Sequence, residues 1–452
     1  SKTIHSMNQQ MASRGPDDSG VHIEGHRGFG HRRLMIMDVT NKSQQPMFDA
    51  ELGLGIVFNG AIYNYKQLRS DLISKGYSFS SDGDTEVVLK AYHAWGIHCV
   101  TKFNGMFAFA IWEKETRQTV IARDRLGIKP LYYSQDVHFF RFASTLPALL
   151  ETDIADQSID PVAINYYLSF HAVVPSPHTI ISGIRKLPPA HYMIVQADGR
   201  VQQQAYWELN FTARQNNAEK TEEEWRSELL SELREAVKRR QIAAVDVGVL
   251  LSGGVDSSLL VGLMAEAGHR NLHTYSVGFE SIGEEAGDEF LYSDIIAETF
   301  QTRHHQIRVS SGELLDQLPN AIQAMSEPMV SHDCIGFYLL SREVSATCKA
   351  VQSGQGADEV FGGYHWYPPL MNSNNPVKDY AKVFFDRDYA EYQQTVSENY
   401  LTANQSEAFV RDHFQRSGAS HPVDKALRLD TTVMLIDDPV KRVDNMTMAW
   451  GL

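Results

Sequence analysis

Apolar residues in the first half of the chain occur in short runs. Residues 54–58, 107–112 and 119–122 are such runs, and Gly, Asp and Asn separate them. Short apolar runs bounded by turn residues are typical of β-strands. Residues 84–95 instead have the spacing of a helix. We therefore predict that residues 20–205 are mostly β-structure with some helix.

The second half has a different pattern of apolar and polar residues. Residues 206–222 are polar and lack periodicity, which predicts a linker, and residues 225–242 then show helical spacing. Strands are predicted at 247–251, 272–277, 305–309 and 350–352, with helices at 258–266, 291–300 and 335–346 between them. Strands separated by helices imply a parallel, doubly wound sheet that binds its ligand at the carboxyl ends of the strands.

The charge balance restricts the partners of the chain. It has 41 Lys and Arg against 56 Asp and Glu, and this net charge of -15 opposes binding to nucleic acids and anionic lipids. The three cysteines lack the spacing of a zinc site or a disulfide framework. No apolar run reaches the roughly 18 residues of a membrane helix. We expect a cytoplasmic protein that binds neither nucleic acid nor membrane, and a homodimer is left open.

The strongest chemical signal is a turn that follows an apolar strand and opens a helix. It reads SGGVDSS, and its candidate ligand-binding residues are Ser252, Gly253, Gly254, Asp256, Ser257 and Ser258. Backbone N–H groups at such a turn bind anions, the glycines admit phosphate oxygens and the serines add donors. Asp256 would repel phosphate unless Mg²⁺ lay between them. The alternative is a capped turn without a ligand.

A second glycine-rich turn, residues 353–364 (SGQGADEVFGGY), follows the strand predicted at 350–352. It carries the acidic pair Asp358 and Glu359. A solvated acidic turn explains this segment poorly, because Val360 and Phe361 follow the carboxylates directly. We therefore expect Asp358 to be the second ligand, with Asp256, of a Mg²⁺–pyrophosphate group.

With both turns in this order, the chain resembles the asparagine synthetase family. The resemblance implies that an acceptor carboxylate attacks ATP to form an acyl-adenylate and pyrophosphate, and that ammonia released from glutamine and carried through the protein then forms the amide. It also implies an ATP pocket that includes Leu250, Val277, Ser353, Gly354 and Gln355. For Leu250 and Val277, simple core packing is the alternative.

Small polar clusters in the first half, among them HRRL at 31–34, resemble the N-terminal-nucleophile glutaminase domain of the same family. The resemblance implies that Arg33 binds the carboxylate of glutamine and Asp84 its α-ammonium. It also implies that the side chain of Asn59 and the N–H of Gly60 form an oxyanion hole. The motif at 122–133 (ARDRLGIKPLYY) is expected to pack and form ion pairs rather than bind substrate.

The expected architecture follows from this resemblance. An α+β glutaminase domain of stacked antiparallel sheets spans residues 1–205 and lacks its first strand, which carries the nucleophilic cysteine in the family. A linker follows at 206–222, and an α/β doubly wound ATP-pyrophosphatase domain, shortened at its C-terminus, spans 223–452. Ser1 is disfavoured as a substitute nucleophile. Ala61 replaces a Glu that is common in this domain, so Asp84 alone must bind the ammonium.

The acceptor is indicated by Gln355, where asparagine synthetases commonly have Glu. A carboxamide cannot act as a base, so the acceptor is expected to differ from aspartate. Residues 92–96, 142–149 and 169–180 are similar to the N-acetylglutaminylglutamine amidotransferase subgroup, which implies an acylated glutamine dipeptide. Two alternatives remain. One is an asparagine synthase with aspartate as the acceptor, and the other is an ammonia-dependent ligase whose glutaminase half is vestigial. Glu327 and residues 331–333 either line the acceptor pocket or cap helices.

Overall fold

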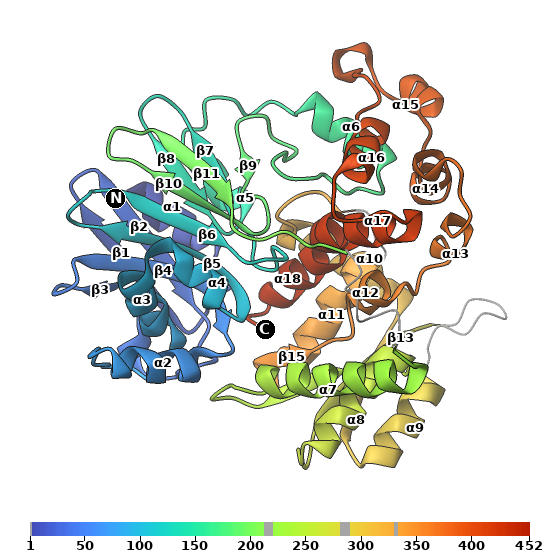
Figure 1. The fold of residues 1–452 in the computed structure, drawn as a ribbon, viewed down its shortest axis with the longest axis horizontal. Coiled ribbons are helices and arrows are strands. Elements are labelled where there is room, and N and C mark those ends of the chain that lie inside the picture. The colour runs from blue at the N-terminus through green and yellow to red at the C-terminus, as the bar shows by residue number, and fades with distance from the viewer. Residues whose placement is uncertain (1, 212–219, 281–289, 330–332) are drawn as a thin grey trace.

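The computed structural model describes residues 2–211, 220–280, 290–329 and 333–452. Its N-terminal half is built on antiparallel strands (Figure 1). A six-stranded sheet has the order β11-β10-β6-β5-β4-β3, beside a β1-β2 hairpin and a β8-β7-β9 sheet. The strands are β1 (Asp18–Glu24), β2 (Arg27–Arg33), β3 (Met47–Asp49), β4 (Leu54–Ile62), β5 (Gly105–Glu113), β6 (Thr119–Arg123), β7 (Tyr132–Gln135), β8 (Phe140–Ala143), β9 (Arg185–Lys186), β10 (His191–Val195) and β11 (Val201–Ala205).

Two apolar clusters show how these sheets stack. Ile56 and Phe58 of β4 face a cluster shared with the helices on one side of the six-stranded sheet, whereas Val57 faces a cluster that includes Phe29 and Tyr133 of the other sheets. The alternation of side chains along a strand explains this division. The covering helices are α2 (Tyr65–Ser74), α3 (Asp84–Trp95) and α4 (Cys99–Lys102) on one side, with α1 (Lys2–Gln10) and α5 (Leu146–Leu150) beyond the second sheet. The predicted stacked antiparallel sheets are confirmed.

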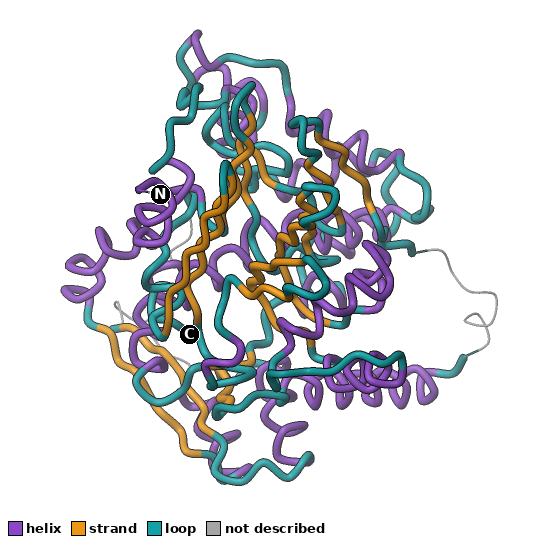
Figure 2. The backbone as a smooth tube through the Cα atoms, turned by 90° about the vertical axis from the view of Figure 1, so that its left-hand side faces the viewer, coloured by secondary structure: helices purple, strands orange, loops and turns teal. Residues whose placement is uncertain are grey.

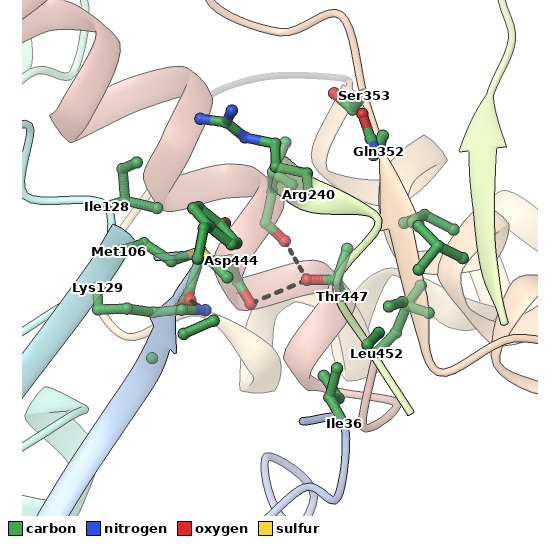
Figure 3. A pocket seen from close by; sticks show the side chains of 18 of the residues that line it. Ile36, Met106, Ile128, Lys129, Arg240, Gln352, Ser353, Asp444, Thr447 and Leu452 are labelled. Carbon is green, nitrogen blue, oxygen red and sulfur yellow. Dashed lines mark hydrogen bonds and ion pairs between the residues drawn. The ribbon is translucent and has the colours of Figure 1, made fainter. Parts of the chain in front are cut away.

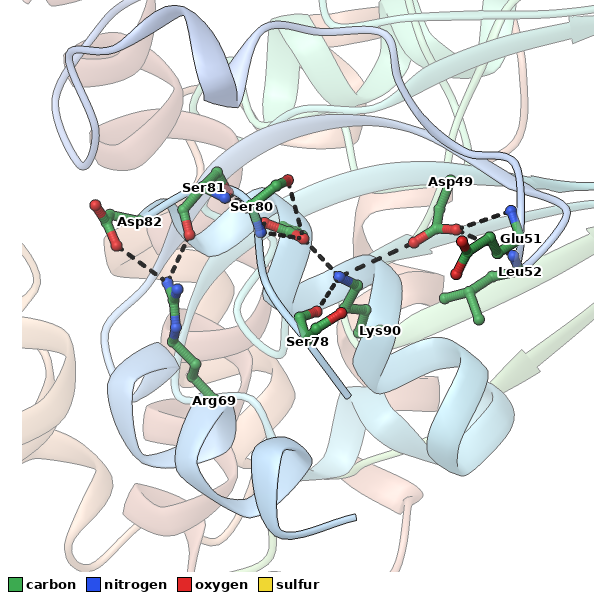
Figure 4. A network of polar contacts seen from close by, with 10 residues as sticks. Asp49, Glu51, Leu52, Arg69, Ser78, Ser80, Ser81, Asp82 and Lys90 are labelled. Carbon is green, nitrogen blue, oxygen red and sulfur yellow. Dashed lines mark hydrogen bonds and ion pairs between the residues drawn. The ribbon is translucent and has the colours of Figure 1, made fainter. Parts of the chain in front are cut away.

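A buried ion pair anchors α3, the helix that begins at Asp84. Glu86 accepts hydrogen bonds from the backbone N–H of Ser80 at 3.0 Å and of Ser81 at 2.7 Å, and pairs with Lys90 at 2.5 Å. Lys90 also donates to the carbonyl of Ser78 (Figure 4). Because the carboxylate and ammonium are both buried and hydrogen-bonded, they fix the start of α3 against the loop before it.

The second half contains the predicted parallel sheet, in the order β14-β13-β12-β15. Its strands are β12 (Val247–Leu250), β13 (His273–Phe279), β14 (Arg303–Val309) and β15 (Ala350–Gln352). One face packs on α7 (Glu222–Arg240), α8 (Val255–Glu266) and α9 (Phe290–Phe300). The other packs on α10 (Ser311–Ala324), α11 (Asp333–Ser345) and α18 (Lys441–Met448). Helices on both faces confirm the doubly wound expectation.

A third group of helices lies at the upper right of Figure 1. Tyr166 and Phe170, at α6, share an apolar cluster with Tyr380 and Phe414 of the second half, so α6 packs away from the antiparallel sheets. The helices of this group are α6 (Pro161–Ser169), α12 (Ala357–Phe361), α13 (Tyr367–Leu370), α14 (Pro376–Phe384), α15 (Tyr389–Thr395), α16 (Gln405–Gln415) and α17 (Pro422–Leu429). Two π-helical turns, Asp430–Met434 and Ile436–Val440, join α17 to α18.

The structure differs from the sequence-based expectations mainly at element ends and at one helix. Residues 2–10 form α1, although their polar composition indicated no element. The helix expected from residue 258 begins at Val255, because Gly254 has the extended conformation of an N-cap. Figure 2 shows the strand-rich half turned toward the viewer. Within the described residues, no helix has the length and apolar character needed to cross a bilayer.

Candidate active site

One edge of β4 presents backbone donors to the side chains around it. The N–H of Phe58 donates to Oε1 of Gln45 at 2.7 Å, and the N–H of Ile62 donates to Oδ2 of Asp84 at 2.9 Å. Opposite Gly60, both backbone groups of Phe107 bond to Asp124 rather than to β4. In an antiparallel pair, this arrangement directs the N–H of Gly60 away from β5. It points to the same side of β4 as the N–H groups of Phe58 and Ile62.

Gly60 has no room for a side chain. A Cβ at this position would lie 2.1 Å from the carbonyl oxygen of Met106. The neighbouring Asn59 directs Nδ2 to the hydroxyl of Ser144 at 3.3 Å. The structure therefore brings the two residues predicted for an oxyanion hole to one lining, beside Asp84.

Asp84 is the carboxylate nearest to this edge. It is 4% exposed, and burial raises the pKa of its carboxyl to about 6 despite hydrogen bonds from the backbone of Ile62 and Thr85. Because a nearby positive charge would stabilise this buried carboxylate, an ammonium group is a suitable ligand for it.

Arg33 lies at the other side of the same lining, at the end of β2. Its two terminal nitrogens donate to the carbonyls of Thr40 at 2.8 Å and Asp38 at 2.6 Å. The guanidinium thus holds the loop that follows β2, and each terminal nitrogen keeps its second hydrogen. The predicted bidentate contact with a substrate carboxylate would use these remaining hydrogens.

The glycine-rich turn after β12 is held by its own side chains. The hydroxyls of Ser252 and Ser257 lie 3.0 Å apart, and the N–H groups of Gly254 and Ser252 donate to them. These two hydroxyls are therefore engaged within the turn, although the sequence indicated phosphate donors. The hydroxyl of Ser258 is buried and has no protein partner.

Gly253 fits this turn for two reasons: its φ is +90°, and a Cβ there would lie 2.6 Å from Cβ of Tyr292.

The second turn packs directly against the first. A Cβ on Gly354 would lie 3.1 Å from Cβ of Asp256, so a side chain at this position would require Asp256 to shift by a few tenths of an ångström. Burial, and then the charge of Asp358, raise the pKa of Asp256. Two carboxylates that repel each other beside a phosphate-type turn have the donor chemistry of a Mg²⁺ site.

Leu250 and Ser353 lie at the carboxyl ends of adjacent strands, as expected for a doubly wound sheet. Val277, in β13, is partly buried and packs with Ile307, and this contact does not distinguish core packing from nucleoside binding.

A single cavity of about 750 Å³ joins these two regions. Its lining includes Arg33, Asn59 and Asp84 from the first half and Asp256, Ser353 and Gln355 from the second. Figure 3 shows Met106 and Lys129 at the left of this cavity, Arg240 and Ser353 at the top, and Thr447 of α18 below Arg240. The two regions therefore share one continuous cavity lining.

Buried ion pairs hold the two halves around this cavity. Asp444 of α18 pairs with Arg14 at 2.8 Å and with Lys129 at 3.1 Å. Lys186 pairs with Asp437 at 2.5 Å and Glu327 at 3.4 Å.

Glu327 therefore lies at the interface between the two halves, where it pairs with Lys186. Residues 331 and 332, also considered for the acceptor pocket, lie outside the described residues, and Asp333 pairs with Arg442 at 3.3 Å.

The motif at 122–133 has the structural role that its sequence indicated. Arg123 donates to the carbonyls of Lys129 at 2.8 Å and Leu187 at 2.7 Å, while Asp124 accepts from three backbone N–H groups of its own loop. Both side chains are buried. Packing and hydrogen bonding account for them, as predicted.

Sequence reasoning missed three residues that line the glutamine side: His31, Gln45 and Ser144. His31 bonds through Nε2 to the carbonyl of Phe58 at 3.1 Å, and burial lowers its pKa to about 4, so its ring is neutral near pH 7. His31 belongs to the HRRL cluster, so that motif could have indicated it. Neither Gln45 nor Ser144 belongs to a motif, so their sequence carried no such signal.

Comparisons with known proteins agree with this arrangement. A family model described as a glutamine amidotransferase domain matches residues 1–207, and one described as asparagine synthase matches residues 228–452. Asparagine synthetase (glutamine-hydrolysing) 1 of Bacillus subtilis (strain 168) is 36% identical over 367 residues, covering 80% of this chain and 56% of that protein. The chain thus spans little more than half the length of this relative.

Two further relatives are covered over more of their length. Putative asparagine synthetase (glutamine-hydrolysing) 2 of Methanocaldococcus jannaschii is 35% identical over 80% of this chain and 72% of its own length. Asparagine synthetase (glutamine-hydrolysing) 3 of Bacillus subtilis (strain 168) is 30% identical over 88% of this chain and 69% of its own length. This chain belongs to the glutamine-hydrolysing asparagine synthetase family.

Proposed function

We propose that this chain is part of an enzyme that uses glutamine and ATP to convert a carboxylate into an amide through an acyl-adenylate. The observation that carries the proposal is the single cavity lined by Asn59 and Asp84 at one end and by Asp256 and Ser353 at the other. One end offers donors for an oxyanion and an anion for an ammonium group. The other offers a phosphate-type turn with paired carboxylates.

At the glutaminase end, each residue has one role. Asp84, ionised above pH 6, binds the α-ammonium of glutamine, and the free hydrogens of Arg33 bind its carboxylate. Nδ2 of Asn59 and the N–H of Gly60 donate to the oxygen that becomes negative when the amide is attacked. The ammonia released enters the cavity, whose lining continues to the synthetase end.

At the synthetase end, the turn at 252–258 and Gly354 bind the phosphates of ATP, with Leu250 and Val277 proposed for the nucleoside. Asp256 and Asp358 would hold Mg²⁺, which when bound neutralises charge on the pyrophosphate. The raised pKa of Asp256 supports this assignment, because a divalent cation relieves the repulsion from Asp358. The acceptor carboxylate attacks the α-phosphorus of ATP, which expels pyrophosphate and gives an acyl-adenylate. Ammonia then attacks the acyl carbon, which forms the amide and releases AMP.

For the acceptor, we propose an acylated glutamine dipeptide such as N-acetylglutaminylglutamine. Gln355 lines the cavity together with the apolar side chains of Ala357, Val360 and Leu435, although the charged Asp256 belongs to the same lining. Aspartate brings an α-ammonium and a second carboxylate that need charged partners, whereas an acylated dipeptide brings only the carboxylate that is converted into the amide.

The test is pyrophosphate release by the full-length protein with Mg-ATP and ammonia, comparing N-acetylglutaminylglutamine with aspartate. Release that depends on the dipeptide is the expected result. Release that depends on aspartate would contradict the acceptor and retain the amidation chemistry. No release with either acceptor, and no glutamine hydrolysis, would contradict the proposed function itself.

A further inference from the structure

The side chain of Asn59 lies between the two stacked sheets. Along β4, Ile56 and Phe58 face the cluster under α2 and α3, whereas Val57 faces the cluster shared with the second sheet. Because side chains alternate along a strand, Asn59 shares the direction of Val57. Its side chain is only partly buried and lines the cavity, so its carboxamide is open to a ligand and needs a protein contact to fix its orientation.

Ser144 is the partner that the structure provides. It directly follows β8, whose last residue, Ala143, pairs with Tyr132 of β7. The next residue, Thr145, caps α5 by accepting a hydrogen bond from the N–H of Ala148 at 3.4 Å. The backbone on both sides of Ser144 is thus fixed, and its hydroxyl oxygen accepts from Nδ2 of Asn59 at 3.3 Å.

We propose that Ser144 is a positioning residue for glutamine hydrolysis, which acts by setting the orientation of the Asn59 carboxamide. This inference rests on the proposed function. Nδ2 carries two hydrogens, and one of them is engaged by Ser144. The other is then directed to the oxygen of the amide under attack, beside the N–H of Gly60.

The physical reason lies in the freedom of a carboxamide to rotate about its side-chain torsions. The Ser144 hydroxyl can accept from Nδ2 or donate to Oδ1, so it restrains the position of the group rather than selecting one of its ends. Without this contact, the group can rotate and withdraw Nδ2 from the developing negative charge. Ser144 does not need to touch glutamine for this role, so its loss affects the transition state more than the binding of substrate.

The experiment is a double-mutant cycle on Ser144→Ala and Asn59→Ala in the full-length protein, with glutamine hydrolysis and ammonia-dependent pyrophosphate release measured separately. We expect Ser144→Ala to lower kcat for glutamine about tenfold, with little change in KM. Asn59→Ala should lower it about 10²–10³-fold. Because Ser144 acts through Asn59, the double variant should be no slower than Asn59→Ala alone.

Two further variants separate positioning from stability. Ser144→Thr keeps the hydroxyl and should restore most of the rate, and Ser182→Ala, whose hydroxyl contacts only Ser158 at 3.1 Å, should hydrolyse glutamine normally. Additive losses in the cycle, an unchanged rate in Ser144→Ala, or a parallel loss of ammonia-dependent release would overturn the inference. Absence of both activities in the unmodified protein would instead overturn the proposed function, and this role with it.

Discussion

Asp84 is the residue whose chemistry depends most directly on pH. Its pKa of about 6 means that the carboxylate is ionised at pH 7.5 and becomes protonated as the pH falls below 6. If it binds the glutamine α-ammonium, the affinity for glutamine should fall about tenfold for each pH unit below 6. Isothermal titration with glutamine between pH 5 and pH 7.5 measures this.

A charge-removing substitution checks the same assignment. Asp84→Asn should weaken glutamine binding at pH 7.5 by about 10- to 100-fold, because a charged hydrogen bond is lost, and should abolish the pH dependence. Asp82→Asn is the matched control, since this carboxylate is 91% exposed and its contact with Arg69 is 3.6 Å long. Equal affinities in Asp84→Asn and the unmodified chain would contradict the role of Asp84.

Gly60 offers a test of geometry rather than charge. Gly60→Ala places a methyl group 2.1 Å from the carbonyl of Met106, so β4 and β5 must move apart. We expect a loss of about 1–3 kcal/mol in the free energy of unfolding and at least a 100-fold loss of glutamine hydrolysis. Urea denaturation and a glutaminase assay measure the two effects.

Gly312→Ala is the control for that substitution. The nearest atom to its built Cβ is the hydroxyl of Ser310 at 4.0 Å, so it should leave glutamine hydrolysis unchanged and, because Gly312 lies in α10, should stabilise the fold by no more than about 1 kcal/mol. A Gly60→Ala variant as stable and active as this control would contradict both the packing and the oxyanion assignment.

At this scale, the sequence predicted residues that belong to motifs and missed residues that act through contacts. Asn59 and Asp84 could be placed because a recognisable pattern surrounds each of them. Ser144 is 85 positions away from Asn59 and meets it only after two sheets stack. The engagement of Ser252 and Ser257 with each other likewise depends on the folded turn, so no spacing rule could predict it.

At the scale of elements, prediction succeeded where periodicity was strong and failed where packing determines the backbone. The strands of the parallel sheet could be located from apolar runs because both faces of that sheet are covered. The two π-helical turns could not be predicted. Pro439 lies inside the second of them, and the segment keeps its helical course because buried partners such as Lys186 hold its side chains.

The contact between β9 and these turns supplies a stability prediction. Lys186→Met should lower the free energy of unfolding by about 3–5 kcal/mol, because Asp437 and Glu327 would keep buried charges without a cation. Arg200→Met, which removes an exposed pair with Asp198, should cost no more than about 1 kcal/mol. Urea denaturation of both variants checks the prediction, and equal losses would contradict the buried-charge explanation.

For the whole molecule, the central feature is that the glutaminase and synthetase ends share one cavity. The order of the two halves and their fold types could be read from the sequence, since each half carries its own motifs. The way they meet could not. Asp444 is held by Arg14, which lies between α1 and β1, and by Lys129 of the motif at 122–133. A long-range ion-pair arrangement of this kind has no local sequence signature.

The shared cavity leads to a prediction that concerns the molecule as a unit. Thr447 of α18 lines the cavity, and in the described part of the chain its hydroxyl bonds to carbonyls of its own helix. Thr447→Trp should obstruct the passage without touching the residues proposed for either reaction. We expect glutamine hydrolysis and ammonia-dependent amidation to persist, while amide formation per glutamine hydrolysed falls at least about tenfold.

Thr447→Val distinguishes obstruction from damage to α18, because it nearly preserves the volume and removes a hydrogen bond that contributes little to helix stability. This variant should remain coupled. The ratio of amide formed to glutamate released, measured in the same reaction with isotopically labelled glutamine, gives the coupling directly. If Thr447→Trp remained fully coupled, ammonia would have to travel by another route, and the cavity would be a feature of packing rather than a conduit.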